Sequence, residues 1–158
     1  MQEFNSFGAF ATHLVKLSAS SHEVVSHVTD RSAEEIQKTA QGMIGQYQQA
    51  IGPYSKWQDL ADSTEAEKAR LGYSVDAPLL RTGEMKNSIE RTVHGYEAAV
   101  GSNDKNMIYH ELGTSKIPPR PVLGPAALHS KPRIEKIIGL SVFAWLAGRG
   151  WRSPRRLD

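Results

Sequence analysis

The sequence predicts an α+β fold in which N-terminal helices precede a small antiparallel β-sheet with a hairpin, and a long C-terminal helix follows. Apolar residues recur at helical spacing before residue 52 and again after residue 133, whereas apolar and polar residues alternate roughly within residues 88–100. The chain has 158 residues, 39% of them apolar and 23% charged. This composition supports one domain with its own core and excludes a wholly disordered chain or a membrane protein.

Two helices are expected between residues 6 and 51. The first begins near Ser6, with an apolar stripe of Phe7, Phe10, Ala11, Leu14 and Leu17. The second begins at Ser32, because Ser32 and Glu35 have the spacing of a capping box, and it ends at Gly52-Pro53. Its apolar stripe consists of Ala33, Ile36, Ala40, Met43, Ile44, Tyr47 and Ile51.

The middle of the chain, residues 57–124, is predicted to hold short elements. We expect a loop over residues 53–63, a short helix from Thr64 to Gly72, and one helical turn at Glu84–Asn87. A β-hairpin follows, from Ser88 to Val100 with its turn at Gly95-Tyr96. A further short helix from Met107 to Leu112 is closed by Gly113.

The segment 113–123 is expected to be an extended strap, because Pro118, Pro119 and Pro121 fix φ and remove hydrogen-bond donors. The C-terminal helix then covers about residues 125–148, and Pro132 either starts it or kinks a longer helix from Pro125. Together these elements make one domain over residues 1–148. Residues 149–158 lack apolar periodicity and are predicted to be a flexible basic tail.

Charge is divided unevenly along the chain. Residues 1–104 hold 9 basic and 14 acidic side chains, whereas residues 105–158 hold 10 basic and 3 acidic ones, so the net charges of −5 and +7 sum to +2. Such a chain suits contact with an acidic partner or with the acidic half of another copy. The densest basic cluster is a predicted nucleic-acid or partner contact formed by Arg149, Trp151, Arg152, Arg155 and Arg156.

No motif in the sequence supports catalysis or a cofactor. Cysteine is absent, and His110-Glu111 lacks the second histidine that a zinc helix would place at position 114. We therefore expect no enzyme, no metal and no cofactor, and a structural role in which His110 or Glu111 bonds nearby backbone before the turn at Gly113. The alternative, a hydrolase that uses these two residues, has no further support. The longest apolar run has about 12 residues, against about 20 for a membrane span, and an acid stands where a secretory signal would place basic residues.

Five groups of residues then follow one another in a specific order. They are Trp57-x-x-Leu60 with Thr64; Lys68 with Gly72; Pro78-Leu79-Leu80-Arg81-Thr82-Gly83-Glu84-Met85-x-x-Ser88-Ile89; Val100-Gly101-Ser102; and Tyr109-His110-Glu111-x-Gly113-Thr114 with Ile117-Pro118-Pro119-Arg120-Pro121-x-Leu123. Over residues 57–124 this order resembles the tail-completion, or head–tail joining, proteins of long-tailed bacteriophages, also called virion morphogenesis proteins. Val122 departs from the family, which usually has phenylalanine there.

The resemblance implies a viral structural protein, made in the host cytoplasm and located in the virion neck. Such proteins form a six-fold or twelve-fold ring around the DNA channel. Their partners are further copies of the chain, a head connector or adaptor, a tail terminator or tail-tube protein, and packaged DNA through non-specific contact. No membrane is involved. The interface would include His110, Glu111, Pro118, Pro119 and Pro121, with Arg120 as the anchor for a carboxylate of the next subunit.

Two alternatives remain open at this stage. One is a tail-terminator or head-closure ring protein of the same neck. The other belongs to a different class, a nucleic-acid-binding module that uses the basic C-terminal half.

Overall fold

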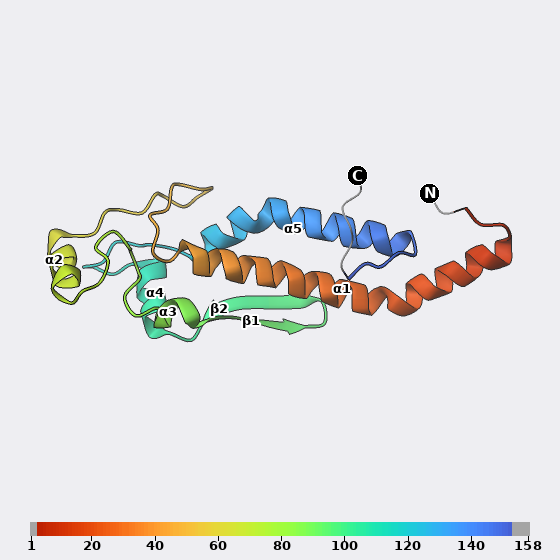
Figure 1. The fold of residues 1–158 in the computed structure, drawn as a ribbon, viewed down its shortest axis with the longest axis horizontal. Helices are drawn as coiled ribbons and strands as arrows, with labels where there is room; N and C mark the ends of the chain where they lie inside the picture. Colours follow the sequence, from red (N-terminus) through yellow and green to blue (C-terminus); the bar gives the residue numbers. More distant parts are fainter. Residues whose placement is uncertain (1–2, 153–158) are drawn as a thin grey trace.

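The computed structural model describes residues 3–152, which form a long molecule built around one central helix (Figure 1). Its elements, in chain order, are α1 (Phe7–Met43), α2 (Asp62–Arg70), α3 (Glu84–Asn87), β1 (Ile89–His94), β2 (Glu97–Ser102), α4 (Lys105–Leu112) and α5 (Leu123–Leu146). The predicted α+β class is confirmed. Within these residues no helix is both long enough and apolar enough to cross a membrane.

The elements form three layers, with α5 on one side of α1 and the β1–β2 hairpin on the other (Figure 1). On the α5 side, the Ser130 hydroxyl donates to the Thr39 hydroxyl at 2.9 Å, and Trp145 Nε1 donates to the Ser20 hydroxyl at 2.9 Å. These two bonds fix α5 along nearly twenty residues of α1.

The hairpin lies along the same stretch of α1. Gln37 Nε2 donates to the Ile89 carbonyl at 2.8 Å, and near the hairpin turn His22 Nδ1 lies 3.0 Å from the Tyr96 hydroxyl. The two strands pair antiparallel, with Ile89 opposite Ser102. The predicted hairpin is therefore confirmed, and it is a two-stranded sheet.

The two expected N-terminal helices are one helix, so the predicted start at Ser32 is wrong. Ser32 lies inside α1, where its hydroxyl donates to the Val28 carbonyl at 2.8 Å instead of capping a new helix. No proline interrupts the sequence before it, so the backbone hydrogen bonds continue.

The end predicted near Ile51 is also wrong. The helix stops at Met43 because Ile44 is extended and Gly45 has a φ of 97°, and Gly45 N donates to the Pro78 carbonyl at 2.9 Å. Ile51 instead pairs with Tyr54 in an isolated bridge.

The remaining predictions differ from the structure mainly at element ends. The helical turn Glu84–Asn87 is confirmed, as is a helix ending at Leu112 before Gly113. The helix predicted from Thr64 begins earlier, at Asp62, and its N-cap Ala61 makes no side-chain bond. The C-terminal helix begins at Leu123 and continues through Pro132.

The core lies where the C-terminal half of α1 meets the hairpin, α4 and the start of α5. Its buried members are Ala40, Met43, Ile44, Trp57, Ile89, Met107, Val122 and Ala126. Most of the motif-bearing segment therefore surrounds this core, which leaves the N-terminal half of α1 outside it.

Candidate interaction surfaces

Arg120 binds its own chain. Its side chain is buried, only 5% exposed, and its Nη2 atom donates to the carbonyls of Gln58 and Asp59 at 3.0 Å each. Burial lowers the pKa of Arg120, although an arginine stays charged. Within the chain the guanidinium therefore holds the strap to the loop before α2, and its predicted bond to a carboxylate of a neighbouring subunit stays a prediction.

Glu111 closes the start of α5 from a distance. Its Oε1 atom accepts hydrogen bonds from Val122 N and Leu123 N, both at 2.8 Å. The N-cap residue of α5, Val122, has no side chain that could accept them. Glu111 thus satisfies two backbone donors that a helix start leaves unpaired.

His110 lies beside this cap and is also structural. Its carbonyl accepts from Arg120 N at 2.6 Å, and its buried Nδ1 atom has no hydrogen-bond partner among the described residues. Burial, and then the nearby Arg120 charge, lower the pKa of His110. The imidazole is therefore neutral at pH 7.

The proline strap is tied to the same body. Trp57 Nε1 donates to the Pro121 carbonyl at 3.1 Å, and Thr114 N donates to the Ile117 carbonyl at 2.8 Å. Gly113 permits the turn before the strap, since it has a φ of 73° and a Cβ there would lie 2.9 Å from Pro119 N. Pro119 is exposed, whereas Pro118 and Pro121 are partly buried.

The described part of the basic cluster, residues 149–152, folds back on α1, and the predicted flexibility of the tail stays a prediction. Arg152 forms an ion pair with Glu23 at 3.1 Å, and its guanidinium lies 5.0 Å from the centre of the Trp151 ring. Trp151 in turn packs edge-on against His27, with ring centres 5.4 Å apart. Arg149 is exposed. Arg155 and Arg156 lie outside the described residues.

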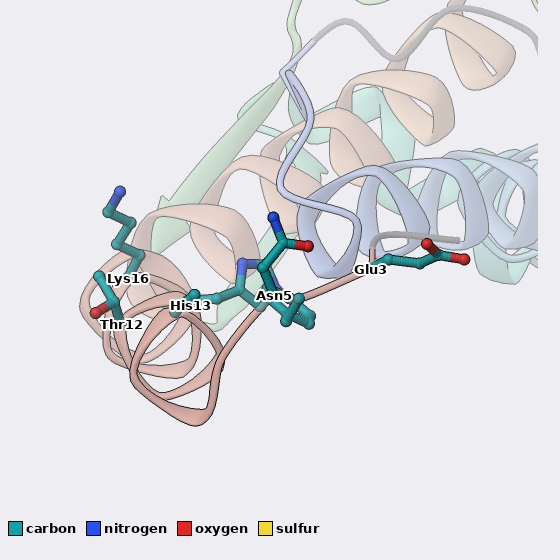
Figure 2. A pocket seen from close by; sticks show the side chains of 7 residues that line it. Glu3, Asn5, Thr12, His13 and Lys16 are labelled. Carbon is teal, nitrogen blue, oxygen red and sulfur yellow. The ribbon is translucent and has the colours of Figure 1, made fainter.

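A shallow hollow lies near the N-terminus, between the segment before α1 and the first turns of that helix (Figure 2). Figure 2 shows Glu3, Asn5, Thr12, His13 and Lys16 around it, and His13 Nε2 lies 3.1 Å from the Leu146 carbonyl.

Residues 3–152 contain no group of three histidine, aspartate or glutamate side chains that could hold a metal ion.

The structure also has exposed faces that the sequence analysis did not single out. The chain exposes 10638 Å², whereas a compact monomer of this mass exposes about 7,900 Å². Large apolar side chains are exposed at the start of α1, on α4 and on α5, among them Phe7, Phe10, Leu14, Ile108, Tyr109, Leu112, Phe143 and Leu146. Helical periodicity marks such residues as apolar, but it cannot tell which of them another element covers.

No protein-family model, curated protein or solved structure matches this chain significantly.

Proposed function

We propose that this chain is a non-enzymatic structural protein of the bacteriophage neck, where it forms a ring that completes the tail or joins it to the head. The observation that carries this proposal is the ordered set of motifs over residues 57–124. The alternative functions within the same neck are those of a tail terminator and of a head-closure protein.

The hydrogen bonds that these motif residues form support the resemblance. Trp57 bonds the strap, Glu111 caps α5, and the Ser88 and Ser102 hydroxyls lie 2.6 Å apart where the hairpin begins and ends. The buried Lys68 ammonium donates to the Ala77 carbonyl. Residues from all five motif groups thus hold one folded unit together, as expected if the order of the motifs reflects a fold and not chance.

The large exposed area also favours an assembled protein. A standard interface buries about 800 Å² on each partner, so a ring subunit with two neighbours buries about 1,600 Å². The difference between the exposed area of this chain and that of a compact monomer of the same mass is larger than about 1,600 Å². It therefore has enough surplus surface for two neighbours.

Sedimentation of the purified chain tests the proposal, alone and with the connector and tail-tube proteins encoded with it. We expect a ring-sized species or co-sedimentation with at least one of the two proteins. A chain that stays monomeric and binds neither protein would overturn the proposal. Tight DNA binding that falls steeply with salt, in the absence of assembly, would instead favour the nucleic-acid-binding module.

A further inference from the structure

The two outer layers of the molecule each present one uncovered face. Alternation along the strands turns Ile89, Arg91 and Val93 toward α1 and leaves the other side of the hairpin uncovered. This hairpin outer face is formed by Glu90, Thr92, His94, Glu97, Ala99 and Gly101. The α5 outer face, on the opposite side of α1, is formed by Leu128, Pro132, Lys136, Gly139, Phe143 and Leu146.

These faces overlap in position along the molecule. At one end of the shared stretch α1 contacts Ser130 of α5 and Ile89 of the hairpin, through Thr39 and Gln37. At the other end it contacts Trp145 and Tyr96, through the neighbouring residues Ser20 and His22. At the usual rise per residue the α5 outer face, from Leu128 to Leu146, is about 27 Å long, whereas each hairpin strand of six residues is about 20 Å long. A second molecule placed beside the first without a shift along α1 therefore brings its hairpin level with the first part of the other α5, and the last turns of α5 extend beyond the hairpin turn (Figure 1).

Charge also differs between the two faces. Lys136 on α5 forms no ion pair among the described residues, and neither do Glu90 and Glu97 on the hairpin. Arg133 and Lys131, in contrast, already have the partners Glu35 and Glu135. The free charge is therefore positive on the α5 outer face and negative on the hairpin outer face, which favours their contact and disfavours hairpin against hairpin.

Side-chain size also differs between the two faces. The α5 outer face carries large apolar side chains, with Phe143 52% exposed and Leu146 51% exposed. On the hairpin outer face the small residues Ala99 and Gly101 lie opposite Thr92 and Glu90. They are level with the middle of α5 and with its Ser130 end, so the face has room there for a bulky side chain such as the exposed Leu128 of a neighbour. An apolar face of this kind is typical of a protein contact.

We propose that α5 of one copy packs against the hairpin outer face of the next copy, and that this is the subunit contact of the ring. The inference rests on the proposed function, because it names the contact that the ring requires. Since the two faces are different and lie on opposite sides of α1, every copy offers both, and the contact is heterologous. The repeating order would be hairpin, α1, α5, and then the next hairpin.

Cross-linking tests this contact directly, because the natural chain has no cysteine. We would prepare two full-length variants, Gly139→Cys on α5 and Ala99→Cys on the hairpin. Both positions are exposed, and a Cβ at Gly139 meets no atom within 4 Å. A short bifunctional maleimide should join an equimolar mixture of the two variants into dimers, and a chain carrying both substitutions should give a ladder of multimers.

Each single variant treated alone is the matched control, and it should remain uncross-linked. Efficient dimers of Gly139→Cys alone would show α5 against α5 and overturn the inference, as would a mixture that gives no cross-linked dimer. If the mixture fails but the chain still forms rings or binds the connector, the proposed function stands and only this contact is wrong. If the chain neither assembles nor binds a neck protein, the proposed function itself fails.

Charge reversal provides a second test that folding defects cannot mimic. Glu90→Lys and Lys136→Glu should each lower the yield of cross-linked dimer at least several-fold in low salt, because each places like charges in contact. The chain with both reversals regains opposite charges across the boundary and should recover most of the yield. Single reversals that leave the yield unchanged would overturn the charge pairing, and circular dichroism would verify that each variant keeps its helices.

Discussion

The packed end of the molecule, built from residues 44–88 and 103–123 around the core, differs from the shaft formed by α1, α5 and the hairpin in how it is held together. At the packed end, buried or partly buried side chains bond the backbone of distant segments, as Arg120, Trp57 and Glu111 do. The shaft outside the core is joined by side-chain bonds between layers and by exposed ion pairs such as Arg152 with Glu23. The difference indicates that the packed end sets stability, while the shaft offers the exposed surface on which the proposed assembly would depend.

The largest effect on stability is expected for Trp57→Ala. Trp57 is 4% exposed and fills the core, and its Nε1 atom bonds the Pro121 carbonyl. Removing the ring should lower the free energy of unfolding by about 3–5 kcal/mol, from lost packing and a cavity. Urea unfolding followed by circular dichroism measures this loss.

Trp57→Phe is the matched control, because it keeps an aromatic ring but not the donor. We expect it to cost about 1–3 kcal/mol. If Trp57→Ala unfolds at the same urea concentration as the natural chain, the packed end does not set stability and the comparison fails.

A smaller loss is expected for Glu111→Ala. The substitution leaves the backbone N–H groups of Val122 and Leu123 without their acceptor at the start of α5. A lost helix cap costs about 0.5–2 kcal/mol, and a charged acceptor lies toward the upper end of such effects. Urea unfolding again gives the value, and hydrogen exchange should show faster exchange at the two freed N–H groups.

Glu111→Gln tests whether the carboxylate acts as an acceptor. The amide oxygen can replace one carboxylate oxygen, so this variant should lose less stability than Glu111→Ala. Equal losses for both variants would instead assign the effect to the charge of Glu111.

Sequence reasoning identified the elements of this fold better than the bonds between them. Apolar periodicity located both long helices, and alternation located the hairpin, because these signals are local. The same local signals wrongly predicted a helix start at Ser32. The sequence alone does not distinguish a serine that caps a helix from one inside a helix, where the hydroxyl donates to a carbonyl of the preceding turn, as Ser32 does.

The cap supplied by Glu111 shows a second reason why bonds between elements are harder to predict from the sequence than the elements themselves. The two residues bonded to it lie 11 and 12 positions away, and no local pattern joins residues at that distance. One signal was present, because Val122 before α5 has no side chain able to cap a helix. A missing local cap near a His-Glu pair in the sequence can point to a remote acceptor. Exposed faces such as that of α5 could not be predicted, since exposure depends on the whole fold.

The stability of the packed end should also depend on pH through His110. Its pKa is lowered mainly by burial, so below the ordinary histidine pKa of about 6.5 the unfolded chain binds a proton that the folded chain does not. Stability contributed by the neutral His110 is therefore present above that pH and is lost as pH falls toward the folded-state pKa. Urea unfolding between pH 7.5 and 5 should show this loss in the natural chain.

In His110→Gln this acid-side loss should be reduced. His129→Gln is the matched control, because His129 is an exposed histidine on α5, outside the packed end, and its replacement should keep the profile of the natural chain. A His110→Gln profile that falls as steeply as that of the natural chain would show that another group causes the loss.

The smallest effect on stability is expected at the end of the shaft, for Arg152→Gln. The Arg152 and Glu23 side chains are 71% and 63% exposed, so water and salt screen their attraction, and such pairs contribute at most about 1 kcal/mol. The free energy of unfolding should change by less than this amount, and 0.5 M salt should remove most of the difference. Faster proteolysis after residue 147 should accompany the change, because Arg152 also covers Trp151. A loss as large as that of Glu111→Ala would mean that the shaft stabilises the fold, and it would remove the distinction between the two regions.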